Sequence, residues 1–350
     1  MSITKKFLWI FLPLAVIIPS LFYIMMTQVA SILQNTPQMP TESISIINGM
    51  STWSSCIMFG VGLALFITLI CIKKWIPLIA VMLFLSIQGV MSLPMGIIMK
   101  YKPEWMAMAM GLTLVASGVV MIWFAHILNF YNAKNIFRNN ISIPLVALGA
   151  IIPLIGGVAG NILNESLNPP NLLEQQFTDM SSNAIGILSI ALIGPIAEEV
   201  VFRGIVCRSL LKSGIPTGLT IVISAIIFGF IHFNPAQIMF AFIMGLFLGY
   251  IYCRTGNLVI PIIAHVVNNS ISAAMMAIYG EEANNMTFEH IFGSQSTVWV
   301  VMVVCIIACI RLVLVFEKKC ESAEVLWDKM EPETKEKSNV TPPEIPQIQK

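Results

Sequence analysis

Apolar residues occur along the chain in long runs, and short polar segments separate these runs from one another. A helix needs about 17–25 apolar residues to cross the hydrocarbon core of a bilayer. The runs that we expect to form transmembrane helices are Phe7–Thr27, Thr52–Ile72, Ile76–Met99, Trp105–Leu128, Ile143–Leu163, Ala184–Leu210, Thr217–Phe233, Gln237–Tyr252, Val259–Tyr279 and Val298–Phe316. The pattern therefore predicts an all-α fold, a polytopic transmembrane helical bundle of about ten spans.

The composition supports a membrane protein. Hydrophobic residues make up 57% of the chain and charged residues only 11%, whereas roughly a quarter of a soluble domain is charged. The net charge is +1, and no basic cluster predicts a nucleic-acid partner. The seven cysteines are scattered without a Cys-x-x-Cys spacing, so neither a disulfide framework nor a zinc ribbon is predicted. We expect a multi-pass protein of the cell membrane.

Basic residues between the runs predict the orientation of the chain. With ten spans and the N-terminus inside, one side of the membrane receives Lys5, Lys6, Lys73, Lys74, Lys134, Arg138, Arg208, Lys212, Arg254, Lys318 and Lys319. The opposite side receives Lys100 and Lys102, together with acidic stretches around Glu174 and Glu282. Because basic residues accumulate on the cytoplasmic side, we expect both termini to lie in the cytoplasm.

The polar residues inside the runs divide the chain into four parts. Residues 1–182 comprise five spans with almost no ionisable side chains and an extracytoplasmic loop, and they are predicted to be a scaffold. Residues 183–280 comprise four spans and hold most of the intramembrane ionisable groups. Residues 281–317 form an outer loop and the last span. Residues 318–350 are rich in Lys, Glu and Pro, and we expect a largely disordered cytoplasmic tail.

Glycines four residues apart predict two close contacts between helices. Gly156 and Gly160 lie in the fifth run, and Gly245 and Gly249 lie in the eighth. Small residues at this spacing let the backbones of neighbouring helices approach each other. We therefore expect both glycine pairs to face another helix.

The segment Gly194–Arg203 places two adjacent carboxylates and a guanidinium within an apolar run. An ionisable side chain at this depth costs roughly 2.5–3.5 kcal/mol, so each one needs a partner or a task. Glu199 precedes Arg203 by four residues, which is the favourable order for an ion pair on one helix face. Glu198 points about 100° away around the helix. The spacing therefore predicts a buried Glu199–Arg203 pair and a separate Glu198 carboxylate.

Two further pairs at the same spacing occur in the spans that follow. They are Phe228 with His232, and His265 with Asn269. Polar groups at membrane depth face the bundle interior and one another, so we expect these faces to converge with Glu198 on one cavity. A carboxylate and an imidazole can activate a water, and N–H donors can stabilise an oxyanion.

The simplest alternative is that these side chains are satisfied interior polar groups. Phe228 is expected to pack beside the site and support it. Asn268 competes with Asn269 as the functional amide, and only the spacing from His265 favours Asn269. Asn234 is a further polar group expected near the site.

Glu-Glu-x-x-x-Arg, Phe-x-x-x-His and His-x-x-x-Asn, in this order, resemble the motifs of the CAAX protease and bacteriocin-processing (CPBP) family. This family includes the type II CAAX prenyl endopeptidases and the lysostaphin-resistance-protein-A-like proteins. The resemblance covers roughly Ile185–Ala274, and the first five spans and the tail do not share it. It implies an intramembrane endopeptidase with its catalytic core in residues 183–280.

The resemblance also implies a role for each motif residue. The catalytic residues would be Glu198, His232, His265 and Asn269. Glu198 would be the general base and His232 would help to activate water, whereas His265 and Asn269 would bind the oxyanion. The residues that structure the site would be Glu199, Arg203 and Phe228.

No cofactor is predicted for this reaction, although the family has also been described as metalloproteases. If a metal is bound, Glu198, His232 and His265 are legitimate zinc ligands. The His-Glu-x-x-His spacing of zinc proteases is absent from the sequence, so a metal-free glutamate mechanism is favoured. The expected partner is a membrane-embedded or lipid-anchored peptide or protein substrate.

Two other classes of function remain open. One is a non-proteolytic bacteriocin-immunity or scaffolding protein of the same fold. The other is a proton-coupled transporter with Glu198 as a proton relay, but the sequence shows no internal repeat of the kind that many transporters have. A Glu198→Gln substitution separates a peptidase from a scaffold, because only the peptidase loses its phenotype.

The position of His232 along its span leads to a further prediction about the length of that helix. His232 lies near the far end of the run that begins at Thr217, so we expect this helix to be short or to start deep in the membrane. The turn at Asn234 and Pro235 would then lie in a protein-lined cavity, where irregular backbone is tolerated. The loop Asn164–Asn183 is long enough to lie across the mouth of this cavity.

Overall fold

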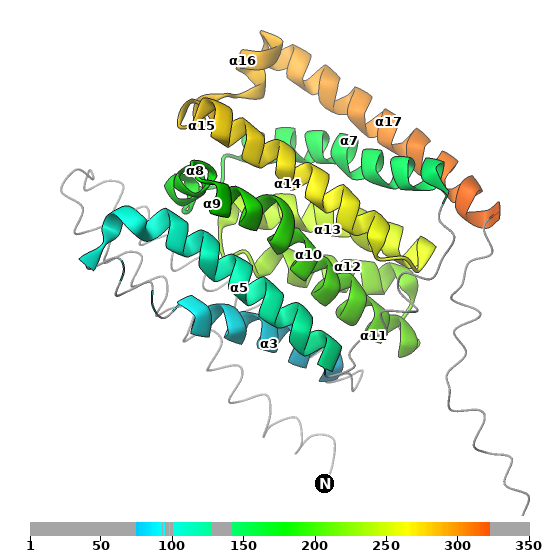
Figure 1. The fold of residues 1–350 in the computed structure, drawn as a ribbon. Helices are drawn as coiled ribbons and strands as arrows, with labels where there is room; N and C mark the ends of the chain where they lie inside the picture. Colours follow the sequence, from blue (N-terminus) through cyan, green and yellow to red (C-terminus); the bar gives the residue numbers. More distant parts are fainter. Residues whose placement is uncertain (1–74, 93, 95–97, 99–100, 128–141, 323–350) are drawn as a thin grey trace, which may run out of the picture.

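The computed structural model describes residues 75–92, 94, 98, 101–127 and 142–322. All regular elements in this part of the chain are helices, and no strand occurs among its residues (Figure 1). The prediction of an all-α bundle is therefore confirmed. The predicted spans Phe7–Thr27 and Thr52–Ile72, and the tail from residue 323 onward, lie outside the described residues.

Six helical segments are long and apolar enough to cross a membrane. They are α5 (Met106–Ile127), α7 (Ile143–Leu167), a composite helix from Ala184 to Lys212, α13 (Pro235–Thr255), α14 (Val259–Tyr279) and α17 (Gln295–Ser322). Two shorter apolar helices are α3 (Trp75–Ser92) and α12 (Thr217–Phe230). The connections contain η1 (Pro103–Trp105), α8 (Glu174–Ser181), α15 (Glu282–Asn285) and α16 (Phe288–Phe292).

Several bounds differ from those predicted. The predicted span Gln237–Tyr252 is longer in the structure, because Pro235 occupies the first turn of α13, where its missing N–H costs nothing. The span predicted to reach Phe233 ends at Phe230. This helix is therefore short, which is one of the two outcomes that the position of His232 led us to expect. The last helix continues to Ser322, and the first residues of the predicted tail are therefore helical.

The composite helix is continuous but not uniform. It consists of α9 (Ala184–Leu188), the π-helical segment η2 (Ser189–Ile193), α10 (Gly194–Glu199), the π-helical segment η3 (Val200–Cys207) and α11 (Arg208–Lys212). The two π-helical segments lie on either side of Glu198 and Glu199. Such segments are rare and occur often at functional sites, and nothing in the spacing of the residues predicted them.

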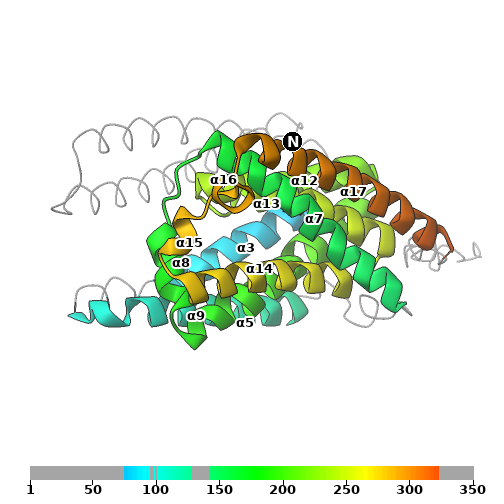
Figure 2. The same cartoon turned by 90° about the horizontal axis from the view of Figure 1, so that it is seen from above.

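The helices form a bundle in which the composite helix is surrounded by others. In Figures 1 and 2, α5 and α17 lie on opposite sides of the bundle, with α14 between them. The helix α14 packs against α7 and α10, and α13 packs against both α7 and α12. The helices α12 and α14 also both pack against the composite helix, so the three segments that carry the sequence motifs are neighbours in space.

Both predicted glycine contacts are present. A Cβ atom at Gly156 would lie 2.3 Å from the Phe247 ring, so α7 and α13 touch closely there. A Cβ atom at Gly245 would lie 2.9 Å from the Cα atom of Ala225 on α12. These glycines bring α13 against its two neighbours.

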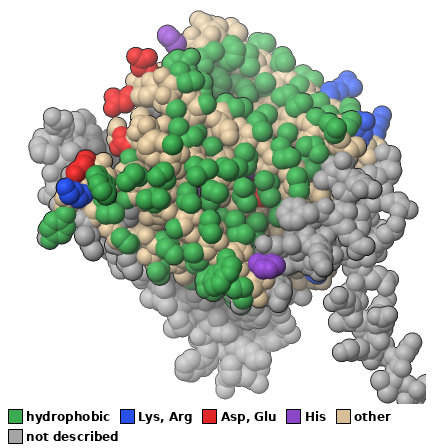
Figure 3. All heavy atoms as spheres, in the orientation of Figure 1, with side chains coloured by type: hydrophobic (Ala, Val, Ile, Leu, Met, Phe, Trp, Pro, Cys, Tyr) green, Lys and Arg blue, Asp and Glu red, His purple; other side chains and the backbone are tan. Residues whose placement is uncertain are grey.

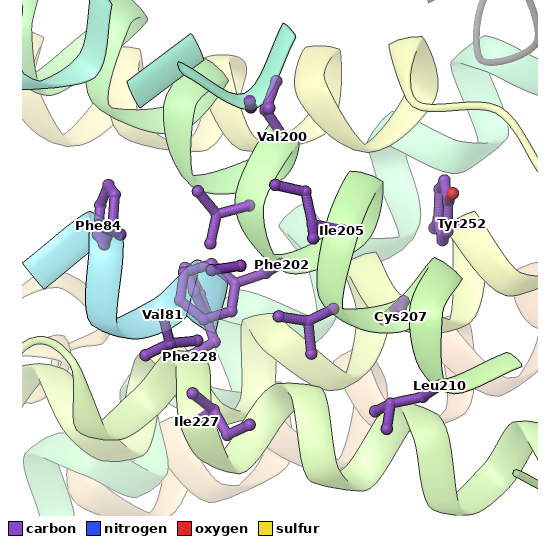
Figure 4. Packing of buried hydrophobic residues seen from close by; sticks show 14 of the residues in the cluster. Val81, Phe84, Val200, Phe202, Ile205, Cys207, Leu210, Ile227, Phe228 and Tyr252 are labelled. Carbon is purple, nitrogen blue, oxygen red and sulfur yellow. The ribbon is translucent and has the colours of Figure 1, made fainter. Parts of the chain in front are cut away.

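A buried aromatic cluster connects α3, η3 and α12. The Phe202 ring packs edge-to-face against Phe84, with centroids 6.3 Å apart, and against Phe228, with centroids 5.1 Å apart. Figure 4 shows these rings among the aliphatic side chains of the core, including Val81 and Ile227. Phe228 therefore borders the apolar core on one side.

The surface agrees with lipid contact. Hydrophobic side chains are spread over the visible face, whereas Asp and Glu gather toward one end of the bundle and most visible Lys and Arg toward the other (Figure 3). The exposed apolar residues on α17 include Val300, Val303, Val304, Ile307, Ile310 and Leu314. Large exposed apolar surfaces mark contact with a membrane or with another protein.

Candidate active site

The predicted ion pair between Glu199 and Arg203 is confirmed. The Arg203 Nη1 atom donates to Glu199 Oε1 at 2.6 Å, and both side chains are completely buried. Arg203 Nη2 also donates to the backbone carbonyl of Gly245 at 3.1 Å, which links the composite helix to α13. The pair therefore neutralises two buried charges and joins two spans.

Glu199 has a second partner that the sequence did not predict. The Nδ1 atom of His265 lies 2.9 Å from the same Glu199 Oε1 atom that pairs with Arg203. His265 is nearly completely buried on α14. The two residues are 66 positions apart, so no local spacing could have revealed the contact. Glu199 thus fixes the orientation of the imidazole ring.

Glu198 points away from Arg203 and toward His265, as its position around the helix suggested. Its Oε2 atom lies 3.7 Å from the Nε2 atom of His265. The Glu198 side chain is 19% exposed, in contrast to the fully buried Glu199 next to it. Glu198 is therefore the carboxylate of this pair that a substrate or a water can reach.

His232 lies on the turn that follows α12. Its Nδ1 atom is 2.8 Å from the backbone carbonyl of Phe228. A carbonyl only accepts, so Nδ1 carries the hydrogen and a neutral ring has its lone pair on Nε2. Among the described residues, no hydrogen bond or ion pair joins His232 to Glu198.

Phe228 connects the second motif to the other two. Its ring packs edge-to-face against His232, with centroids 5.1 Å apart, and against His265, with centroids 5.7 Å apart. The Arg203 guanidinium carbon lies 4.7 Å from the centroid of the Phe228 ring, within range of a cation–π interaction. The expectation that Phe228 supports the site by packing agrees with this position.

Asn269 does not contact Glu198 directly. Its Nδ2 atom donates to the backbone carbonyl of Ile190, within the π-helical segment η2, at 3.2 Å. Its Oδ1 atom accepts from Asn268 Nδ2 at 3.1 Å. These two bonds fix which way the amide faces and leave one Nδ2 hydrogen for another acceptor. Asn268 therefore orients Asn269, a role that the spacing alone did not indicate.

The turn after His232 is covered by the loop predicted to cross the cavity mouth. Asn234 is fully buried; its Oδ1 atom accepts from the backbone of Leu172 at 3.0 Å, and its Nδ2 atom donates to Asn171 Oδ1 at 2.9 Å. Phe233 has a φ of 51°, which is unfavourable for a residue with a side chain. The loop and the strained turn together hold His232 in place at the end of α12.

The zinc alternative depends on how the three predicted ligands, Glu198, His232 and His265, are arranged. In its neutral form each of the two imidazole rings would carry the hydrogen on Nδ1, because Nδ1 faces an acceptor, and Nε2 would then be the ligand atom. However, the described residues contain no group of three or more His, Cys, Asp or Glu side chains placed to hold a metal ion. Both the metal-free mechanism and the zinc alternative with Glu198, His232 and His265 remain predictions.

Comparisons with known proteins agree with the motif-based resemblance. Residues 180–271 match the family described as Rce1-like, the type II CAAX prenyl endopeptidases. The putative membrane peptidase YdiL of Bacillus subtilis (strain 168) is 32% identical over 91 residues, which are 25% of this chain and 36% of that protein. The chain thus spans about a third of the length of this relative, and no solved structure matches significantly. The resemblance to the CPBP family is confirmed for the segment that holds Glu198, His232 and His265.

Proposed function

We propose that the protein is an intramembrane endopeptidase that hydrolyses a peptide bond of a membrane-embedded or lipid-anchored protein or peptide. The observation that carries the proposal is the placement of Glu198, a partly exposed carboxylate, 3.7 Å from an imidazole that a second carboxylate holds in place. The match to a prenyl endopeptidase family and to a putative membrane peptidase supports the class of reaction.

In the proposed reaction Glu198 is the general base. It takes a proton from a water whose oxygen attacks the carbonyl carbon of the scissile bond. His232 shares the binding of this water through the lone pair on its Nε2 atom. The negative charge that develops on the substrate oxygen requires N–H donors nearby, and Asn269 and His265 are the candidates, one helical turn apart on α14.

The remaining motif residues position this machinery. Glu199 orients the ring of His265 and is itself neutralised by Arg203. Phe228 packs between the two imidazoles and thereby fixes their separation. Glu199, Arg203 and Phe228 are buried, and the low local dielectric of a protein interior strengthens the hydrogen bonds among such groups.

The test compares membranes from cells that express the wild-type protein or the variants Glu198→Gln and Glu198→Ala. Quantitative proteomics should reveal a fragment that is present with the wild-type protein and at least about a hundredfold less abundant with either variant. The exposed Glu289 provides a matched control, because Glu289→Gln should leave the fragment unchanged. A phenotype that survives both Glu198 substitutions would overturn the proposal in favour of a scaffolding or immunity function.

A further inference from the structure

A buried guanidinium without a partner lies near the end of the composite helix. Arg208, the first residue of α11, is only 6% exposed, and its Nη1 atom is buried without a hydrogen-bond partner. Within the part of the chain that the structure describes, Arg208 forms neither a hydrogen bond nor an ion pair. A buried charge without a counter-charge is strongly destabilising. Arg208 therefore requires an acceptor that the described residues do not provide.

A second buried donor without a partner lies in the turn between α13 and α14. Asn257 is 1% exposed, and its Oδ1 atom accepts from the backbone N–H of Val259 at 2.7 Å. This bond fixes the amide at the first residue of α14, and the Nδ2 atom is buried without a hydrogen-bond partner. Because Nδ2 can only donate, it also requires an acceptor.

The antiparallel packing of the composite helix against α14 brings these two donors to the same end of the bundle. Glu199 contacts His265, and further along the composite helix a Cβ atom at Gly204 would lie 3.6 Å from the Leu258 side chain. Arg208 follows Gly204 by one helical turn on nearly the same face. Long side chains on a helix lean toward its N-terminus, so the Arg208 side chain extends toward the turn between α13 and α14.

The surroundings of the two donors favour an anion over a neutral ligand. Arg208 interacts electrostatically with Tyr252 on α13, which belongs to the same buried cluster as Cys207 (Figure 4). The helix α14 has no acidic residue in its first turn, and the N-terminus of a helix carries a partial positive charge. A guanidinium, an amide N–H and a helix N-terminus all attract negatively charged oxygens.

We propose that Arg208 and Asn257 bind the phosphate group of an anionic phospholipid. The guanidinium can donate two parallel hydrogen bonds to phosphate oxygens. The end of α11 and the start of α14 lie where most visible Lys and Arg side chains gather (Figures 1 and 3). Basic groups at the membrane surface attract anionic headgroups, so phospholipid phosphate is the anion that this end meets at the highest local concentration.

This site is separate from the candidate active site and does not depend on the proposed peptidase function. A phosphate held by both donors would connect α11 to the turn that precedes α14. It would thereby stabilise the packing between the two helices that carry Glu198 and His265.

The first test measures the thermal stability of the full chain in a neutral detergent with added lipid. Phosphatidylglycerol should raise the Tm, whereas phosphatidylcholine should have little effect, because its choline cation would approach the same basic end of the bundle. Equal effects of the two lipids would overturn the proposal. Inorganic phosphate at the same concentration, or a short peptide with a free terminal carboxylate, would overturn the assignment to a lipid if it stabilised the protein as much as phosphatidylglycerol does.

The second test removes the cation. Arg208→Met keeps much of the side-chain volume, and native mass spectrometry should show an affinity for phosphatidylglycerol that is lower by about tenfold or more, because hydrogen bonds to charged groups contribute at least this factor. The exposed Arg311→Met on α17 is the matched control and should change the affinity by less than about twofold. Equal reductions in the two variants would mean that the lipid responds to overall charge, which would overturn the site.

The third test supplies the anion from the protein and leaves Arg208 in place. Asn257→Asp keeps an oxygen to accept from Val259 and puts a carboxylate where the phosphate is proposed to bind. We expect a higher Tm without lipid and an affinity for phosphatidylglycerol that is lower by about tenfold or more. An unchanged response to the lipid would overturn the proposal, and this result decides alone if Arg208→Met does not fold.

A double variant separates the ion pair from a simple helix cap. The gain in Tm from Asn257→Asp should largely disappear in the Arg208→Met background, because contacting residues are not additive. An equal gain in both backgrounds would mean that the new carboxylate acts only on the N-terminus of α14. Arg208 and Asn257 would then not share a ligand, and the proposal would fail.

Discussion

The composite helix from Ala184 to Lys212 and the helix α17 are both long and apolar enough to span a membrane, yet their surroundings differ. Half of the most apolar stretch of the composite helix is buried within the protein, compared with 11% in α17. The composite helix carries Glu198, Glu199 and Arg203 at its centre, whereas the apolar face of α17 is exposed. Charged residues at membrane depth are therefore found where other helices, rather than lipid, surround them.

Each of the two helices also contributes to an ion pair, and the two pairs differ in how deeply they are buried. On α17, Glu317 pairs with Arg254 and accepts from the Tyr250 hydroxyl at 2.6 Å. The Arg254 and Glu317 side chains remain 32% and 28% exposed, whereas Glu199 and Arg203 are at 0%. A fully buried pair must recover its desolvation cost from further hydrogen bonds, and the Gly245 carbonyl and His265 provide them.

Removal of Arg203 should have the largest effect on stability. Arg203→Met preserves much of the side-chain volume but leaves Glu199 as a buried charge without its cation, which costs about 3–5 kcal/mol. The free energy of unfolding in mixed detergent micelles measures the loss. The exposed Arg311→Met on α17 is the matched control and should change stability by less than about 0.5 kcal/mol. Equal effects of the two substitutions would contradict the contrast between the helices.

A smaller loss is expected from a substitution that crowds the contact between α12 and α13 but removes no polar partner. In Gly245→Ala the new Cβ atom would lie 2.9 Å from the backbone of Ala225 and 3.3 Å from the Phe228 ring. Overpacking of this kind costs about 1–3 kcal/mol, and the shift of Phe228 should also lower the proposed proteolytic activity. Gly218→Ala on α12 meets no atom within 4 Å, so it should be neutral or stabilise the helix by up to about 1 kcal/mol. A harmless Gly245→Ala would show that α12 and α13 can separate freely.

The features that the sequence predicted correctly are those encoded by local spacing. The Glu199–Arg203 pair, the short helix before His232 and the glycine contacts each depend on residues within one or two turns of a helix. Apolar runs likewise indicated the helices, because the bilayer requires a minimum length.

The missed features depend on how distant segments pack. The bond from Asn269 to the Ile190 carbonyl joins residues 79 positions apart, and the bond from Leu172 to Asn234 joins residues 62 positions apart. The π-helical segments around Glu198 were also missed. One carbonyl in each segment, that of Ile190 and that of Phe202, accepts a hydrogen bond from a side chain of another helix, which the local sequence does not indicate. A single sequence shows which residues could form such contacts, but it does not show which distant residues pair with each other.

The smallest effect is expected at the ion pair of α17. Glu317→Gln keeps the shape of the side chain and removes a charge from a pair that is about a third exposed, where such pairs contribute about 0–1 kcal/mol. The Tyr250 hydroxyl can still donate to the amide oxygen, so part of the contact between α13 and α17 should persist. Unfolding in the same micelles should therefore show a much smaller loss of stability than in Arg203→Met. The proposed proteolytic activity should be unchanged, because Glu317 lies outside the motif-bearing segment. A loss of stability as large as that of Arg203→Met would mean that a partly exposed ion pair at the edge of the bundle contributes as much stability as a fully buried one. The contrast between α17 and the composite helix would then fail.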